Sequence, residues 1–206
     1  MNQRNYQKEL DHILEGLGQE TVPTLLLYVC CAPCSSYVVE YLSRYFEITY
    51  FFYNPNLDEE EEYIRRRDEA IRFLKEIPAK HPVHFLEGPY DRELWLENIR
   101  GLEKEPEGAA RCTVCFRMRL KKSAEMCREL HCDYFTTSLT ISPLKNAALL
   151  NALGEEAANK AGVHFLPSDF KKRNGFLRST ELSREYGLYR QDYCGCSFSK
   201  RNKENA

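Results

Sequence analysis

Clustered cysteines are the residues of this chain best able to do chemistry. The 206-residue sequence contains nine cysteines. Most of them fall into three short clusters: Cys30, Cys31 and Cys34; Cys112 and Cys115; Cys194 and Cys196. Groups of thiolates bind soft or borderline metals, which makes zinc and iron–sulfur clusters the first candidates. The fold is therefore expected to bring these distant segments together.

Two of the clusters have the spacing of a metal-ligand set. Cys112-x-x-Cys115 and Cys194-x-Cys196 together offer the thiolates that hold a [4Fe–4S] cluster. A closed, tetrahedral zinc site uses the same kind of ligand set. Spacing alone favours zinc, whereas the Cys-x-Cys arm and the surplus cysteines favour iron. Both interpretations stay open at this point.

The remaining cluster, Cys30, Cys31 and Cys34, indicates a second metal site or a redox relay. The C-x-x-C of Cys31 and Cys34 also matches that of thioredoxins, where a helix N-terminus lowers the thiol pKa. That interpretation leaves the other clusters unexplained. Cys30 or Cys31 taken alone could be a buried apolar residue at a strand end. Cys127 and Cys132 lie outside the clusters and are predicted to be packing residues.

Strands alternate with helices along the chain, which predicts an α/β fold with a mostly parallel five-stranded sheet. The predicted strands cover residues 24–29, 48–53, 83–86, 134–138 and 163–166. Helices are predicted up to about residue 20 and over 35–45, 59–77, 90–99, 112–130, 145–161 and 181–186, with Gly187 left-handed after the last. The expected organisation is a helical extension (1–23), one domain (24–199) and a flexible tail (200–206).

The working site of an open parallel sheet lies outside the carboxyl ends of its strands. The first cysteine cluster directly follows the first predicted strand, so it belongs at that edge. The loops at 54–56 and 138–143, after the second and fourth strands, should open onto the same crevice. No glycine-rich phosphate loop follows the first strand, which disfavours a nucleotide-binding role.

The composition predicts a cytoplasmic protein with no membrane partner. The first ten residues are too polar for a signal peptide, and no apolar run approaches the ~20 residues of a membrane span. Thiol clusters in a reducing cytosol bind metals or act in catalysis more often than they form disulfides. The net charge of −2 decides nothing about nucleic acid, because only the distribution of charge does. The charges from Glu59 to Arg67 are predicted to face solvent.

A basic stretch near the C-terminus is a candidate RNA-binding surface. Cations interleaved with aromatic residues suit phosphate contacts and base stacking on single-stranded RNA. A solvated loop explains the stretch more simply when it is taken alone, but its position just before the last cysteine cluster favours RNA. The candidate cations are Lys171, Lys172, Arg173, Arg178 and Arg190.

Taken together, these motifs resemble those of the cobalamin-independent epoxyqueuosine reductases, the QueH family. The likeness covers about residues 24 to 199. The matching stretches are Tyr28 to Ser35, Phe51 to Asn56, Glu105 to Gly108, Arg111 to Leu120, Ser168 to Lys172, Arg178 to Ser183 (except Thr180) and Tyr186 to Cys196.

The resemblance implies a three-layer, HUP-type Rossmann-like fold with cysteine-rich metal-binding loops. It also implies the last step of queuosine synthesis, a two-electron deoxygenation of the epoxide on the wobble nucleoside of tRNA with a GUN anticodon. The implied cofactors are a [4Fe–4S] cluster and a second metal, usually iron, supplied with electrons by an external donor such as ferredoxin or flavodoxin.

Residue roles follow from the resemblance as expectations. Cys112, Cys115, Cys194 and Cys196 are expected to hold the cluster, and Cys30, Cys31 and Cys34 the second metal, with Cys34, Asp169 or Asp192 completing its ligand set. The second metal would act as a Lewis acid toward the epoxide oxygen, and Asp169 or a metal-bound water is the candidate proton donor. The rival interpretations are a non-catalytic, zinc-stabilised RNA-binding protein, another iron–sulfur tRNA-modifying enzyme, and a thiol–disulfide oxidoreductase.

Overall fold

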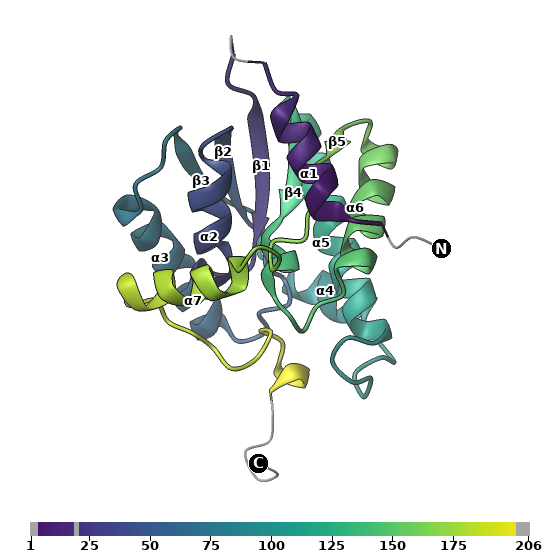
Figure 1. Cartoon of the computed structure of the whole chain (residues 1–206). Helices are drawn as coiled ribbons and strands as arrows, with labels where there is room; N and C mark the ends of the chain where they lie inside the picture. Colours follow the sequence, from purple (N-terminus) through teal and green to yellow (C-terminus); the bar gives the residue numbers. More distant parts are fainter. Residues whose placement is uncertain (1–3, 19–20, 201–206) are drawn as a thin grey trace.

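A parallel β-sheet forms the centre of the protein, whose computed structural model describes residues 4–18 and 21–200. Its strands are β1 (Thr24–Val29), β2 (Glu47–Phe52), β3 (Val83–Glu87), β4 (Tyr134–Thr137) and β5 (His164–Phe165). They lie in the order β3-β2-β1-β4-β5, and every neighbouring pair is parallel. Helices cover both faces (Figure 1). The predicted α/β, Rossmann-like architecture is confirmed.

The helices are α1 (Tyr6–Glu15), α2 (Ala32–Leu42), α3 (Glu60–Glu76), α4 (Arg92–Asn98), α5 (Ala110–Glu129), α6 (Ala147–Ala161) and α7 (Gly175–Glu185), with short 3₁₀ helices η1 (Ser138–Ile141) and η2 (Ser197–Ser199). The first three pack on one face of the sheet, and α5 and α6 pack on the other. α7 lies against α2 on the outside. No helix among the described residues is long and apolar enough to cross a membrane.

β1 is buried on both faces because it lies at the centre of the sheet. Leu25, Leu27 and Val29 face the α2 side, whereas Leu26 and Tyr28 face the α5 side. Helices on both faces of a parallel sheet require such a continuous apolar run. The same burial holds the end of β1, and therefore the thiols that follow it, in a fixed position.

Three helices differ clearly from the sequence prediction. α2 covers Ala32–Leu42 rather than 35–45, so Cys34 lies in its first turn. α1 ends at Glu15 rather than near residue 20, and the part of the prediction at residues 19–20 lies outside the described chain, as do residues 201–206 of the predicted tail. α7 begins at Gly175, well before the predicted Glu181, so part of the basic stretch is helical. Gly187 after α7 has φ 55°, as predicted.

Gly175 permits α7 to start against α2. A Cβ placed there would lie 2.0 Å from the Phe170 carbonyl oxygen and 2.5 Å from the Tyr37 ring. The backbone contact cannot relax without moving the helix. The sequence alone does not predict this close approach, because a glycine within a polar stretch is equally typical of a loop.

We expect Gly175→Ala to lower the free energy of unfolding by about 1–3 kcal/mol, the usual cost of overpacking. The matched control is Gly16→Ala, where the nearest atoms lie at 3.5 Å or more and φ is −84°. Urea unfolding followed by circular dichroism measures both. Equal stability of the two variants would contradict the packing argument.

Candidate metal and active site

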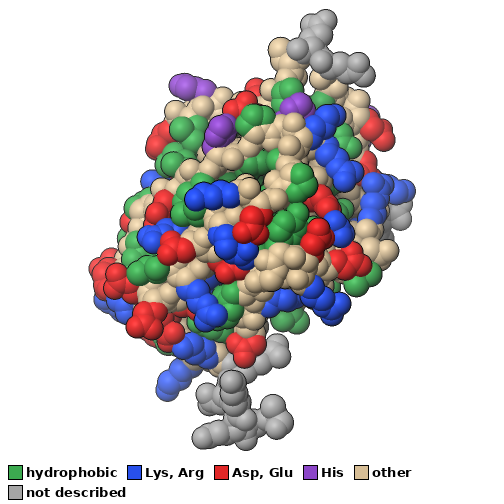
Figure 2. Space-filling view, turned by 90° about the vertical axis from the view of Figure 1, so that its left-hand side faces the viewer, with side chains coloured by type: hydrophobic (Ala, Val, Ile, Leu, Met, Phe, Trp, Pro, Cys, Tyr) green, Lys and Arg blue, Asp and Glu red, His purple; other side chains and the backbone are tan. Residues whose placement is uncertain are grey.

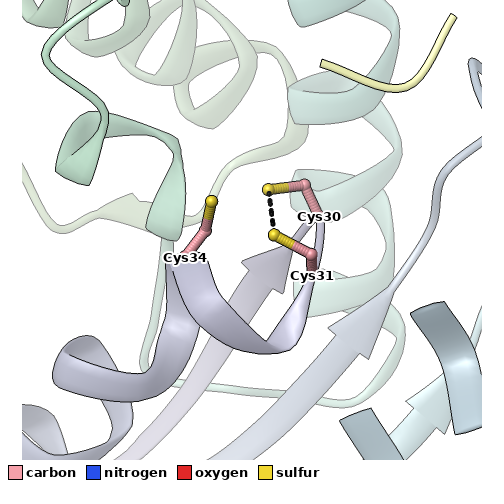
Figure 3. Close-up of side chains that lie close together, drawn as sticks. All are labelled: Cys30, Cys31 and Cys34. Carbon is pink, nitrogen blue, oxygen red and sulfur yellow. Dashed lines mark hydrogen bonds between the residues drawn. The ribbon is translucent and has the colours of Figure 1, made fainter. Parts of the chain in front are cut away.

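Three thiols converge at the carboxyl end of β1. The ligand atoms of Cys30, Cys31 and Cys34 all lie within 4.8 Å of one another, and the Cys30 and Cys31 sulfurs are 3.7 Å apart. Figure 3 shows the three side chains pointing into one space, two from the strand end and one from the first turn of α2. Among the described residues, no other set of three or more cysteine, histidine or carboxylate ligands is this close. The donor set fits one thiophilic metal ion.

The fold dictates the convergence of this trio. Cys31 is the N-cap of α2, and Pro33 follows in its first turn, where a missing N–H is tolerated. The Ser35 hydroxyl donates to the Cys31 carbonyl at 3.0 Å and contacts the Tyr50 hydroxyl at 2.7 Å. The strand order reverses between β1 and β4, so the thiols occupy the topological switch point where such folds bind ligands.

One thiol of the trio is the easiest to ionise. Hydrogen bonds from Cys30 and Cys34, together with the Arg66 guanidinium and the Gln191 amide, lower the pKa of Cys31 despite its burial. The Gln191 Nε2 lies 3.1 Å from its sulfur. A thiolate at Cys31 then raises the pKa of Cys30 to about 12. Metal binding at the trio must therefore displace protons, which makes affinity fall as pH falls.

The other four clustered cysteines lie next to this trio but are spread more widely. Cys194 lines the same cavity of about 200 Å³ as Cys30 and Cys34. It also lines a second cavity, of about 190 Å³, with Cys112. Cys115 and Cys196 pack together around Trp95. Burial, with added repulsion from the Cys194 and Cys196 thiolates, raises the pKa of Cys115 to about 11.

Unpartnered hydrogen-bond donors surround these sulfurs. Arg119 is fully buried and donates to the Asn56 side chain at 2.9 Å, but its Nε and Nη2 have no acceptor among the described residues. Arg66 Nη2 and Trp95 Nε1 are also buried without an acceptor among the described residues. Such donors cost about 1–3 kcal/mol each when left unpaired. Anionic sulfur bound between them would supply the missing acceptors.

The C-terminal segment that carries Cys194 is fixed to α3. Arg66 donates to the Cys194 carbonyl at 3.1 Å and pairs with Glu62 at 2.6 Å. Arg66 and Glu62 are both buried, since only 2% of Arg66 and 8% of Glu62 is exposed. The prediction that the charges from Glu59 to Arg67 simply face solvent is therefore wrong for these two residues. Tyr189 adds a further contact, since its N–H donates to Glu69.

The carboxylates predicted for the site divide between two cavities. Asp192 lines the cavity of Cys30 and Cys34. Asp169 lines a separate cavity and pairs with Lys171 at 2.6 Å. Its place is fixed because the backbone of the preceding Ser168 exchanges hydrogen bonds of 2.9 and 2.8 Å with the Asn151 side chain. The structure thus does not bring Asp169 into the cavity of the trio.

Most of the predicted RNA-binding cations are paired with carboxylates. Lys172 is exposed, and Arg190 lines the trio's cavity and reaches the Ser183 hydroxyl at 3.3 Å. Figure 2 shows basic and acidic side chains interspersed over one face rather than a patch of one sign. The ion pairs are Lys171–Asp169 (2.6 Å), Arg173–Asp11 (2.5 Å) and Arg178–Glu40 (2.5 Å).

Several site residues were not predicted from the sequence. Lys145, Gln191 and Phe176 line the trio's cavity. Arg66 donates to the carbonyl of Cys194, and Arg119 donates to the side chain of Asn56 in the loop after β2. Burial lowers the pKa of Lys145, but the negative charge that Cys194, Cys30 and Cys34 carry when ionised raises it by more, so the net shift is upward and the ammonium stays charged. The sequence pattern predicts Lys145 as the first residue of a helix, whereas it lies in the connection just before α6.

Cys127 and Cys132 play the predicted packing role. Cys127 is fully buried in the core between α5, α6 and the sheet, and Cys132 packs against the same core. All nine cysteines are free.

Comparisons with known proteins point to one family. A family model described as "Epoxyqueuosine reductase QueH" matches residues 25–202, a range that contains all three cysteine clusters. Three similar proteins carry the same name. They come from Streptococcus pyogenes serotype M1 (44% identity, covering 95% of this chain and 78% of the relative), Staphylococcus epidermidis (41%, 95% and 84%) and Thermotoga maritima (32%, 85% and 90%).

We expect the oxygen-free apoprotein to bind Co²⁺ at the trio with sulfur-to-cobalt charge-transfer absorption in the near ultraviolet. Cys34→Ser should remove one tightly bound ion per chain or weaken its binding at least about tenfold, because changing even a residue that only supports a ligand costs that much. Cys132→Ser, remote from the trio, is the matched control. An unchanged number of tight sites in Cys34→Ser would exclude the trio as a metal site.

Proposed function

The chain belongs to the QueH family of epoxyqueuosine reductases, which are oxidoreductases, and we propose that it removes the epoxide oxygen of epoxyqueuosine at the wobble position of tRNA. The substrate would be tRNA with a GUN anticodon, and the product queuosine, in the last step of its synthesis. The reducing cytosol is the proposed location, which agrees with nine free cysteines.

We further propose which thiols hold which metal. Cys112, Cys115, Cys194 and Cys196 would hold a [4Fe–4S] cluster, since their wider spacing leaves room for several irons and sulfides. Cys30, Cys31 and Cys34 would hold a single ion, with iron as the proposed metal and Asp192 as the carboxylate within the same cavity. The buried donors of Arg119 and Trp95 support an anionic cluster, because hydrogen bonds to sulfur tune its potential.

The observation that carries the proposal is the cavity that Cys194 shares with Cys30 and Cys34. One predicted cluster ligand and two predicted metal ligands thus line the walls of one space at the sheet's switch point. Apolar groups of Leu144 and Phe176 form the other side, and both side chains are partly exposed. A ring bearing an epoxide can enter such a space while the tRNA stays outside.

The overall reaction takes up two electrons and two protons and releases water, leaving a carbon–carbon double bond. Bound metal would supply Lewis acidity and electron transfer. An external donor of the ferredoxin or flavodoxin class would provide the electrons. The protein's own part is to admit the ring, exclude bulk water and hold positive charge near the oxygen.

The proposal is tested by incubating the reconstituted protein without oxygen with epoxyqueuosine-containing tRNA and a reductant, and by digesting the tRNA to nucleosides for mass spectrometry. Loss of one oxygen mass from the nucleoside is expected. Unchanged substrate, with a colourless protein that holds stoichiometric zinc, would instead favour the zinc-stabilised RNA-binding interpretation.

We expect Cys30→Ala to abolish turnover while keeping most of the visible absorbance of the cluster, because Cys30 belongs to the trio and not to the four cluster ligands. Cys132→Ala should keep both turnover and absorbance. Visible spectra and single-turnover assays measure the two effects separately. Turnover near the wild-type rate in Cys30→Ala would rule out this partition of the cysteines.

Simultaneous replacement of Lys171, Lys172 and Arg173 by Ala should raise the apparent KM for tRNA and flatten its dependence on salt, by about one unit of slope for each phosphate that is no longer neutralised. The matched control removes three distant cations, Lys121, Lys122 and Lys160. If both triple variants gave the wild-type slope, the basic stretch would not belong to the RNA-binding surface.

A further inference from the structure

One cation at the centre of the site has no carboxylate partner within residues 4–18 and 21–200. Lys145 lines the cavity of Cys30 and Cys194, the adjoining cavity of Cys112, and the cavity of Asp169. It is half-buried, and its ammonium makes no ion pair or side-chain hydrogen bond in the described part of the chain. Nearby Lys171, in contrast, pairs with Asp169 at 2.6 Å.

The connection between β4 and α6 holds Lys145 in place. Its N–H donates to the Ser142 carbonyl at 3.2 Å. The next residue, Asn146, caps α6 by accepting from the Leu149 N–H at 3.1 Å. Ile141, four residues before Lys145, is 2% exposed and packs in the core. These contacts fix the backbone of Lys145 at the junction of the cavities that its side chain lines.

The cavities that Lys145 lines contain sulfur and three carboxylates, those of Glu107, Asp192 and Asp169, but among the described residues the ammonium forms an ion pair with none of them. The sulfurs of Cys194, Cys30 and Cys34 would attract it once ionised, but sulfur is a weak hydrogen-bond acceptor. An ammonium has three N–H donors. An oxygen atom that enters the cavity of Cys30 and Cys34 would therefore find an uncommitted charged donor on its wall.

We propose that Lys145 donates a hydrogen bond to the epoxide oxygen of the substrate and stabilises the negative charge that develops there as the carbon–oxygen bond breaks. This inference rests on the proposed function. Positioned donors aimed at a developing oxyanion are a large source of catalysis in water-poor sites. Lys145 thus joins the catalytic residues as one that touches the reacting atom.

The step needs no reactant beyond those of the proposed reaction. The two electrons come from the external donor and break both carbon–oxygen bonds. The oxygen takes up two protons and leaves as water. Any proton that Lys145 gives to the oxygen returns to it from solvent.

Binding measurements without reductant test the contact apart from turnover. The two ligands are tRNA containing epoxyqueuosine and tRNA containing queuosine, which differ in one oxygen atom. The reconstituted wild-type protein should bind the epoxide form more tightly. Lys145→Met should reduce that preference by about tenfold, the value of one charged hydrogen bond, while its affinity for the queuosine form stays the same.

Turnover and spectra complete the test. We expect kcat to fall about 100-fold in Lys145→Met, with the visible absorbance of the metal centre unchanged and part of the activity restored in Lys145→Arg. Lys145→Gln is a second neutral variant. Lys160→Met is the matched control, because Lys160 lies at the other end of α6, is exposed, and pairs with Glu156 at 2.6 Å.

The outcomes separate this inference from the proposed function. Suppose that the wild-type protein converts the epoxide, but that Lys145→Met and Lys145→Gln keep the wild-type preference for epoxyqueuosine-containing tRNA or the wild-type kcat. The hydrogen bond from Lys145 to the epoxide oxygen is then overturned, and the proposed function stands. Loss of the metal absorbance in both variants would also overturn it, by assigning Lys145 a role in holding the metals. If the wild-type protein leaves the epoxide unchanged, the proposed function itself fails.

Discussion

Buried guanidinium groups are the interaction on which the site depends. Arg66, on α3, donates a hydrogen bond to the Cys194 carbonyl, and Arg119, on α5, donates one to the Asn56 side chain in the loop after β2. Arg111 likewise donates to backbone carbonyls of the loop that precedes α5 and of the C-terminal segment. Each is nearly inaccessible to water. A hydrogen bond from a charged donor is worth about 1.5–3 kcal/mol, more than a typical exposed ion pair, so these contacts hold the loops around the site more firmly than surface ion pairs could.

The buried charges have two effects. They join loops that share no regular secondary structure, and they leave buried donors without acceptors close to the cysteine sulfurs. A set of loops held by neutral packing alone would close around the thiols but would not favour their ionised forms. Positive charge inside the protein therefore couples the shape of the site to the ionisation of its thiols, on which metal binding would depend.

Much of the fold was predictable from the sequence, and part of the site was too. The five strands can be predicted because each is rich in apolar, aromatic or β-branched residues, and the position of Cys30 follows from its place directly after β1. The convergence of Cys30, Cys31 and Cys34 was readable from local spacing. The burial of Glu62 and Arg66 was not, because a charged helix face shows no sign of the C-terminal segment that covers it. Lys145 escaped notice because a single lysine carries no pattern.

Because Cys194 and Cys30 line one cavity, the order in which the chain is synthesised matters for how this cavity is completed. All five strands precede Cys194 along the chain, whereas the wall of the cavity that Cys194 supplies comes after them. Since the ribosome makes a chain from its N-terminus, the residues of the sheet and of the trio are synthesised before that wall. A chain that had folded only as far as β5 would leave the trio open on this side, until the C-terminal segment covered it through Arg66 and the loop at Asp58. An ion bound by the trio would reach it more directly before that segment closes the pocket than afterwards.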